Sequence, residues 1–377
     1  MVKKITECSL AIAETVRNCN PDVVACFPIT PSTHIAEKLA DFYANGEIRE
    51  YITVESEHSA ISALVGASAA GGRTFTATSS QGLLLMHEVL FNASGMRLPI
   101  VMFNALRAIS APLNIWCDHQ DAMSQRDTGW IQIYVKNSQE AVDSIVQAYK
   151  IAEKTMLPVM VCGDGFFLTH AVEEMDIPDS DLIKKYLPKL DMKLRLDSEK
   201  PVSLGVYAIP DDYQGFRQDL AEDMEKSLNE ILKADEKWKK LTGREYGLLE
   251  GYQTKDAERV IVAMGAQASN GKEAVNHLRE KGEKVGLLIL RIFRPFPYKQ
   301  VAEALAGKEV LVFDRSISPG ADAPLYSEVS NAINKEGGKV KKLYSAIGGL
   351  GGRDNNVDIY IKLFDEMKTG KVEKWIY

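Results

Sequence analysis

Two ionisable residues stand where short hydrophobic runs end, and both could take part in chemistry. Glu57 follows the run YITVES at 51–56, and Arg107 lies a few residues after IVMF at 100–103. In open α/β sheets the active site lies beyond the carboxyl ends of the strands, so residues in these positions are the first candidates. A buried carboxyl group can hold a proton, and an arginine offers a planar fork of donors that fits a carboxylate or phosphate. The pattern indicates an acid and an anion clamp at one sheet edge.

Each of these two residues also has a simpler explanation. A glutamate at the start of a helix is ordinarily a partner of the helix dipole, and an arginine often pairs with a nearby acid. The segment after Glu57, HSAISALVGASAAGG, consists almost entirely of small residues and can pack closely against a neighbouring backbone. This close packing favours a buried acid, which requires a hydrogen-bonding partner.

Two more turns after strand-like runs carry polar side chains. The turn Phe27-Pro28-Ile29-Thr30-Pro31-Ser32-Thr33 contains two stiffening prolines. We expect Ser32 or Thr33 to cap the following helix, which leaves Thr30 for a ligand. The second turn is polar and flexible and contains Ser80 and Gln81.

Three other motifs are interpreted as unrelated to catalysis. Asp118-His119 could belong to a hydrolase dyad, but the chain has no GxSxG nucleophile elbow. Gly163-Asp164-Gly165 could begin a metal-diphosphate motif, but the Asn pair expected downstream is missing. The glycine-rich segment 348–352 lacks the Lys-Ser/Thr of a P-loop, so we expect it to form an interdomain or intersubunit contact.

The elements that must position these residues alternate between strands and helices. Uniformly apolar runs indicate strands buried on both faces, and helices between them indicate repeated βα units with a parallel sheet. The predicted strands are 23–27, 51–56, 74–79, 100–103, 130–135 and 159–162, and the predicted helices are 34–44, 58–71, 82–95 and 139–154. The N-terminal segment MVKKITECSLAIAETVRNCN has apolar residues at helical spacing and is interpreted as a first amphipathic helix.

The pattern changes after residue 170. Residues 171–255 are charged and proline-containing, with no convincing strand and one long solvated helix at about 216–240. A second α/β pattern follows, with predicted strands at 259–265, 285–295, 309–314 and 339–347 and helices at 269–281, 298–306, 324–335 and 357–367. The expected organisation is a doubly wound domain at 1–170, a connecting arm at 171–255 and a smaller α/β domain at 256–377.

Composition narrows the class of protein. The 377 residues include 52 acidic and 45 basic ones, and the net charge of -7 argues against nucleic-acid binding. No apolar run approaches the roughly 20 residues of a membrane span, so a soluble protein is expected. Five scattered cysteines without a CxxC pair build neither a zinc site nor an iron–sulfur cluster in this chain, and their odd number suits reduced thiols in a cytoplasm.

Long stretches resemble a known family. Several stretches are similar to α subunits of the pyruvate:ferredoxin oxidoreductase (pyruvate synthase) family. In the N-terminal half they are FPITPSTHIAE, TVESEHSAISALVGASAAGGRTFTATSSQGLLLMHE, RLPIVMFNALRAISAPLNIWCDHQDAM and RDTGWIQIY, and near the C-terminus they are LLILRIFRPFP, FDRSISPGADAPLY and GGLGGRD. The resemblance implies a domain that binds the aminopyrimidine of thiamine diphosphate, followed by a transketolase-C-terminal-like domain. It also implies a β subunit with Mg²⁺ and a cluster, γ and δ subunits with further [4Fe–4S] clusters, and ferredoxin and coenzyme A as reactants.

The resemblance assigns roles to the candidate residues. Glu57 corresponds to the glutamate that hydrogen-bonds the pyrimidine ring, with Ser80 and Gln81 as further cofactor contacts. Arg107 corresponds to the clamp for the 2-oxoacid carboxylate, and Thr30 to a hydroxyl that also contacts the substrate. Phe27 stands where family members commonly have Tyr, which bears on substrate identity or rate.

Several functions stay open at this point. The PLNIW…DHQD segment favours pyruvate, but enzymes for branched-chain 2-oxoacids, 2-oxoglutarate and oxalate share the architecture. A transketolase or dehydrogenase type of thiamine-diphosphate subunit would need a sugar-phosphate or lipoyl partner, and basic residues for a sugar phosphate are not evident. A non-catalytic scaffolding paralogue would be favoured by loss of Glu57 or Arg107, and both are present.

Overall fold

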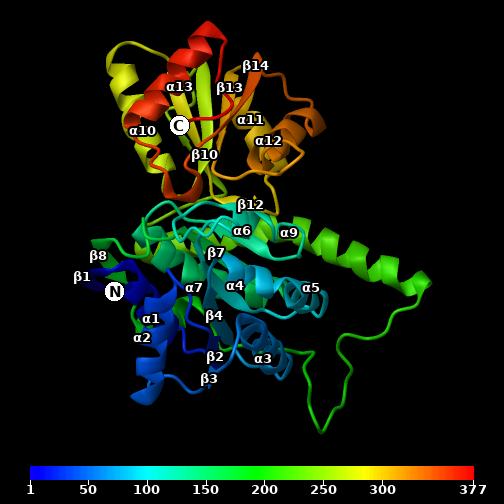
Figure 1. Ribbon diagram of the computed structural model, residues 1–377. Coiled ribbons are helices and arrows are strands. Elements are labelled where there is room, and N and C mark those ends of the chain that lie inside the picture. Colours follow the sequence, from blue (N-terminus) through cyan, green and yellow to red (C-terminus); the bar gives the residue numbers. More distant parts are fainter.

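The first and largest of three sheets has seven strands and contains the predicted strands of the N-terminal half. The computed structural model describes residues 1–377 (Figure 1). In spatial order the strands are β12 (Ile292–Arg294), β6 (Ile131–Tyr134), β7 (Val159–Asp164), β5 (Val101–Leu106), β4 (Thr74–Thr78), β2 (Val23–Cys26) and β3 (Tyr51–Thr53). All pairs are parallel except β12 with β6. The predicted doubly wound parallel sheet is confirmed.

Helices cover both faces of this sheet, which explains why its strands are apolar throughout. One face packs against α1 (Cys8–Asn18), α2 (Thr33–Ala44) and α7 (Ser138–Thr155). The other face packs against α3 (Glu57–Ala69), α4 (Ser80–Leu85), α5 (His87–Gly95) and α6 (Gln120–Met123). The two groups of helices lie on opposite sides in Figure 1. Every residue of β4, β5 and β7 is buried.

The second sheet has five strands and lies beyond β12, an edge strand of the first sheet (Figure 1). Its order is β14 (Lys342–Ile347), β13 (Glu309–Asp314), β10 (Arg259–Met264), β11 (Val285–Leu290) and β9 (Leu249–Tyr252), with only β9 antiparallel. α10 (Ala268–Glu280) and α13 (Val357–Thr369) cover one face, and α11 (Tyr298–Leu305) and α12 (Pro324–Lys335) cover the other. One apolar cluster contains residues from both sheets, including Tyr134 of β6 and Leu288 of β11.

Three predicted elements differ from the structure. Residues Val2–Glu7 form strand β1 rather than the start of a helix, because they pair with β8 (Val172–Ile177) from a distant part of the chain. The predicted strand 285–295 divides at Arg291, so that β11 joins the second sheet and β12 joins the first. The predicted helix 82–95 is two helices, α4 and α5, that meet at Met86.

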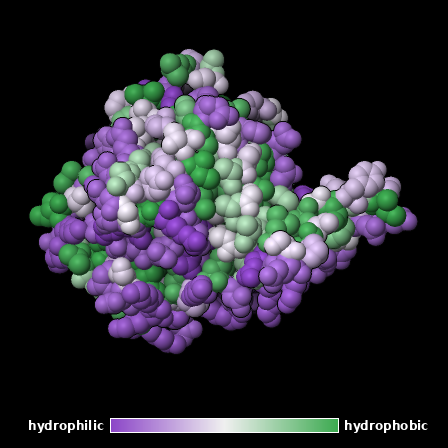
Figure 2. Space-filling view, turned by 90° about the horizontal axis from the view of Figure 1, so that it is seen from below, coloured by the Kyte–Doolittle hydropathy of each residue, from purple (hydrophilic) through white to green (hydrophobic).

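The segment 171–255 is more structured than its charge suggested. It contains two strands, β8 and β9, and a short helix, α8 (Ser180–Tyr186), none of which were predicted. The long helix α9 (Pro210–Thr242) is solvated only in part, because Ile231 and Trp238 are buried against α7. Its N-terminal half and the preceding extended segment project from the molecule, as Figures 1 and 2 show. No helix of the chain is long and apolar enough to cross a membrane.

Candidate active site

Four of the predicted site positions follow four adjacent strands. Thr30 comes after β2, Glu57 after β3, Ser80 after β4 and Arg107 after β5, and the order β5-β4-β2-β3 is unbroken in the sheet. The carboxyl ends of parallel strands share one edge, so these residues gather on one side of the molecule. Thr30, Glu57, Ser80 and Arg107 therefore share one edge of the sheet.

Backbone carbonyl groups, rather than acids, hold Arg107. Its Nη1 donates to the carbonyl oxygen of Thr30 at 2.9 Å, and its Nε donates to the carbonyl oxygen of Asn114 at 3.1 Å. The side chain is buried and has no ion-pair partner in the chain, so the alternative of a structural ion pair is not supported. Burial lowers the pKa of Arg107, partly offset by the charge of Asp121. A buried, unpaired guanidinium is suited to binding an anion.

The Thr30 turn differs from its expected capping geometry. The hydroxyl of Ser32 donates to the carbonyl oxygen of Ile29 at 2.8 Å and makes no capping bond to helix α2. The predicted side-chain cap by Ser32 or Thr33 is therefore wrong, because the turn uses the Ser32 hydroxyl for its own closure. Thr30 itself is exposed, and only its backbone carbonyl is bonded to Arg107.

Glu57 is a buried carboxyl group without a side-chain partner. It is the first residue of α3, whose N-cap Ser56 accepts a hydrogen bond from the backbone N–H of Ser59 at 3.3 Å. Glu57 is 6% exposed, and its side chain makes no hydrogen bond to another residue. Burial raises its pKa above the ordinary value, and its own backbone N–H opposes this shift. The sequence-based expectation of a buried acid at this position is met by the geometry.

Glycine at position 82 allows the backbone to approach this carboxyl group. A Cβ placed on Gly82 would overlap Glu57 Oε1 and lie 2.6 Å from Thr78 Oγ1. Thr78 Oγ1 and the neighbouring Gln81 Nε2 are both buried without hydrogen-bond partners. Glu57 Oε1 and the unsatisfied Thr78 Oγ1 therefore both lie beside Gly82, at the ends of β3 and β4.

Ser80 supports the site instead of offering its side chain to it. Its backbone is left-handed (φ 47°), and its hydroxyl lies 2.5 Å from the carbonyl oxygen of Ala108 and 2.6 Å from Gln81 Oε1. The hydroxyl proton can serve only one of these acceptors at a time, and both lie within the chain. Of the two predicted cofactor contacts after β4, the Gln81 amide nitrogen is the one left free.

Asp121 organises the site, and the sequence did not single it out. Its Oδ2 accepts from the backbone N–H of Ser80 at 2.9 Å, from the backbone N–H of Arg107 at 3.2 Å and from Asn104 Nδ2 at 3.2 Å. Burial raises its pKa to about 7, against the effect of these hydrogen bonds. In the sequence, only its position inside the DHQD segment pointed to Asp121. Its role could not be inferred from residue types, because it binds backbone groups that only the fold brings together.

An arginine that follows a strand of the second sheet binds an aspartate at the end of a strand of the first sheet. Arg315, which follows β13, binds Asp164 at the end of β7 with an Nη1 to Oδ2 distance of 2.6 Å, and His119 Nε2 lies 3.2 Å from Asp164 Oδ1. Both Arg315 and Asp164 are buried. Burial alone raises the pKa of Asp164, but the Arg315 charge and the His119 hydrogen bond outweigh it and hold the pKa below its ordinary value. The Gly-Asp-Gly motif therefore supplies an ion pair in this chain.

The glycine-rich segment 348–352 contacts the loop that anchors Arg107. The backbone N–H of Gly351 donates to Asp118 Oδ2 at 3.1 Å, and its carbonyl oxygen accepts from Asn114 Nδ2 at 3.1 Å. Gly352 has φ +83°, and a Cβ there would overlap the side chain of Trp116. The prediction that this segment forms an interdomain contact is confirmed.

Comparison with known proteins agrees with this geometry. Residues 14–236 match the family model described as pyruvate flavodoxin/ferredoxin oxidoreductase, thiamine diphosphate-binding, and residues 257–359 match the one described as pyruvate:ferredoxin oxidoreductase core domain II. The chain belongs to the pyruvate:ferredoxin oxidoreductase family. The resemblance stated from the motifs is therefore confirmed. The predicted edge residues lie in the first match, and Arg315 and the glycine-rich segment lie in the second.

Individual members of this family match nearly the whole chain. Pyruvate synthase subunit PorA of Methanocaldococcus jannaschii is 49% identical, over 95% of this chain and 92% of its own, and that of Methanothermobacter thermautotrophicus is 47% identical, over 94% and 92%. Ketoisovalerate oxidoreductase subunit VorA of Pyrococcus horikoshii is 41% identical, over 100% and 97%. The structure of a 2-oxoglutarate:ferredoxin oxidoreductase from Magnetococcus marinus shares the fold, with a TM-score of 0.73 at 19% identity. That match covers 97% of this chain, which spans 65% of the other one.

Proposed function

We propose that this chain is the α subunit of a pyruvate synthase. The proposed reaction converts pyruvate, coenzyme A and oxidised ferredoxin to acetyl-CoA, CO₂ and reduced ferredoxin, and it is reversible. The observation that carries the proposal is that one sheet edge holds both a carboxyl group without a side-chain partner, Glu57, and a guanidinium without an ion-pair partner, Arg107. The identity of the chain to pyruvate synthase subunits supports the choice of substrate.

The residues around Glu57 fit the aminopyrimidine of thiamine diphosphate. The carboxyl group of Glu57 can bond a ring nitrogen, and the free Nε2 of Gln81 can donate to a ring acceptor. Gly82 leaves room for the carboxyl itself, because a Cβ there would overlap Glu57 Oε1. When bound, the cofactor supplies a nucleophilic carbon and an electron sink for decarboxylation of a 2-oxoacid.

Glu57 has the environment that a proton-sharing acid needs. Because burial raises its pKa, the carboxyl retains its proton closer to neutral pH than an exposed glutamate does. A protonated carboxyl group donates a hydrogen bond, and an ionised one accepts a hydrogen bond. In a contact between Glu57 and a ring nitrogen, the proton can therefore lie on the carboxyl group or on the nitrogen. The low polarity of its surroundings strengthens that contact.

Arg107 and Thr30 bind and orient the substrate in this proposal. The two carbonyl bonds fix the plane of the guanidinium and leave Nη2 for the carboxylate of the 2-oxoacid. The exposed hydroxyl of Thr30, beside it, can contact the same substrate. These residues place the reacting carbonyl carbon and prevent the substrate from rotating.

Partner subunits complete the site. Beside the anchor of Arg107, the exposed apolar side chains of Leu113, Ile115 and Trp116 mark a surface that a second chain would cover. We assign the Mg²⁺-diphosphate half of the site and a cluster to a β subunit, and the remaining [4Fe–4S] clusters and electron transfer to ferredoxin to γ and δ subunits. All five cysteines of this chain are buried and free.

Two alternatives are separated by one experiment. The assembled complex is tested for reduction of ferredoxin with coenzyme A and, in turn, pyruvate, 2-oxoisovalerate, 2-oxoglutarate or oxalate. We expect the highest kcat/KM with pyruvate; a higher value with another acid would overturn the choice of substrate. An intact complex that holds thiamine diphosphate but oxidises none of them would identify a scaffolding paralogue instead.

The role of Glu57 has its own test in the same complex. Glu57→Gln keeps the shape of the side chain but cannot exchange a proton, so kcat should fall by about 10²- to 10⁴-fold with assembly unchanged. Glu55→Gln is the matched control, because Glu55 is exposed and bonded only to Ser59, and it should keep normal turnover. Near-normal turnover of Glu57→Gln would remove Glu57 from the mechanism.

A further inference from the structure

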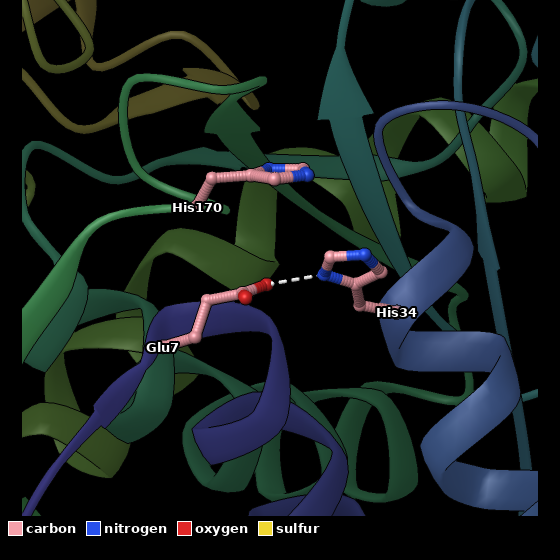
Figure 3. A group of neighbouring side chains, drawn as sticks. All are labelled: Glu7, His34 and His170. Carbon is pink, nitrogen blue, oxygen red and sulfur yellow. Dashed lines mark hydrogen bonds and ion pairs between the residues drawn. The ribbon is translucent and has the colours of Figure 1, made fainter.

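A second group of ligand-type side chains lies outside the proposed active site. Glu7 ends β1, His34 lies in the first turn of α2, and His170 lies in the turn between β7 and β8. One carboxylate oxygen and one nitrogen of each ring all lie within 4.8 Å of one another. Figure 3 shows the three side chains, from three separate parts of the chain, gathered around one space. We propose that Glu7, His34 and His170 form a binding site for a single divalent transition-metal ion of the zinc class.

The chemistry of the group matches this class of ion. Two imidazoles and one carboxylate are a common set of protein ligands for Zn²⁺, and they leave a coordination position for water. His34 Nδ1 lies 2.7 Å from Glu7 Oε1, and the His34 and His170 rings are 4.9 Å apart between centroids. Glu7 has no lysine or arginine partner, so its charge is available to a cation.

The backbone around the group is fixed before any ion binds. The backbone N–H and the hydroxyl of Ser9 both donate to the carbonyl oxygen of Thr169, at 3.0 and 2.7 Å. Glu7 pairs with Val172 in the β1–β8 ladder, so the residues that flank Glu7 and His170 are tied together. Ligands held on fixed elements lose little conformational freedom on binding.

Thr169 supplies the outer contact that metal-binding histidines usually have. Its buried hydroxyl accepts from the backbone N–H of Phe166 at 2.8 Å and lies 2.8 Å from His170 Nδ1. A bond from Nδ1–H to this hydroxyl leaves Nε2 with its lone pair, which fixes the tautomer for a metal. The same bond orients the ring.

No other set of side chains in the chain competes for such an ion. The five cysteines are all buried, and burial raises the pKa of Cys8 to about 12 and that of Cys26 to about 11, which suppresses the thiolate form. His119 is buried against Asp164, whereas His58 and His277 stand alone on exposed helix surfaces. A single saturable site is therefore expected.

The test is titration of the purified, chelator-treated full chain with Zn²⁺ by calorimetry, with Co²⁺ as a spectroscopic probe. We expect one equivalent to bind at micromolar or lower concentration, to raise the melting temperature and, for Co²⁺, to give the visible absorption of a four-coordinate ion. His34→Ala, His170→Ala and Glu7→Gln should each abolish these effects, and Thr169→Val should weaken binding about tenfold. His277→Ala, an exposed histidine on α10, should bind as the unaltered chain does.

The outcomes distinguish a built site from scattered surface binding. Circular dichroism of each metal-free variant establishes that it is folded, so loss of binding can be attributed to loss of a ligand. Binding only at millimolar Zn²⁺, or equal stoichiometry in His34→Ala, His170→Ala and His277→Ala, would overturn the proposal. Because the titration measures no turnover, its result is independent of the proposed pyruvate synthase activity.

Discussion

The ion pair between Arg315 and Asp164 should be one of the strongest single links between the two sheets. Arg315→Met removes the charge and keeps a side chain of similar length. It leaves Asp164, which is fully buried, without its cation and with only His119 as a side-chain partner. Removing one partner of a buried pair costs about 3–5 kcal/mol of unfolding free energy, because the remaining charge has no water to solvate it.

The pH dependence of this variant has a defined sign. In the unaltered chain the pKa of Asp164 lies below the ordinary value, so the pair stabilises the fold above about pH 4 and this contribution is lost as the pH falls through the lower, folded pKa. In Arg315→Met, burial is no longer opposed by the guanidinium, and the pKa of Asp164 should rise. The variant then takes up a proton on folding. Its stability deficit should therefore be largest near pH 8 and should shrink as the pH falls toward 4.

Thermal unfolding between pH 4 and 8 measures this deficit. The double variant Asp164→Asn, Arg315→Met removes both charges and should recover a substantial part of the lost stability. Lys362→Met, which breaks an exposed pair with Glu373, is the control and should change stability by about 0–1 kcal/mol. An unchanged melting temperature for Arg315→Met, or a double variant no more stable than the single one, would refute the reasoning.

Two further predictions concern the site itself. Gly82→Ala should destabilise the chain by about 1–3 kcal/mol and lower turnover of the complex, because its Cβ would displace the Glu57 carboxyl. Gly66→Ala, in an exposed position of α3 with no atom within 4 Å, should instead raise stability by about 0.5–1 kcal/mol at unchanged turnover. Arg107→Lys should lower kcat/KM for the 2-oxoacid by about 10- to 100-fold in steady-state assays, because lysine lacks the fork that two carbonyls now orient. Equal effects of the two glycine variants, or a normal kcat/KM for Arg107→Lys, would contradict these assignments.

The apolar runs predicted most of the fold because burial on both faces leaves a direct mark on composition. β4, β5 and β7 are buried at every residue and were all identified from the sequence. β1 was missed because its partner β8 is remote in sequence and only the pairing makes either segment a strand. The division at Arg291 was missed because nothing local separates β11 from β12; Arg291 itself is buried beside Glu140.

The site was predictable where its residues follow strands and unpredictable where backbone atoms do the binding. Glu57 and Arg107 were identified because the carboxyl-end rule needs only strand positions. Asp121 was not, because its contacts are the N–H groups of Ser80 and Arg107, and these have no residue-type signature. The Ser32 hydroxyl was also mispredicted. It could either cap helix α2 or close its own turn, and residue type alone does not decide between these two local hydrogen bonds.

The distribution of satisfied and unsatisfied polar groups supports the proposed position of the ligand. Ser80 and Asp121 bond to groups of the chain itself, and so do two of the donors of Arg107, which fixes the edge of the sheet. The Gln81 amide nitrogen and Thr78 Oγ1 are buried without a partner, although buried polar groups in folded proteins are normally paired. Unsatisfied atoms occur elsewhere in the chain, but here an acid, the unsatisfied Thr78 Oγ1 and a glycine that makes room for the acid lie together at the ends of β3 and β4. A buried polar group without a partner costs free energy, which supports the proposal that a ligand binds here.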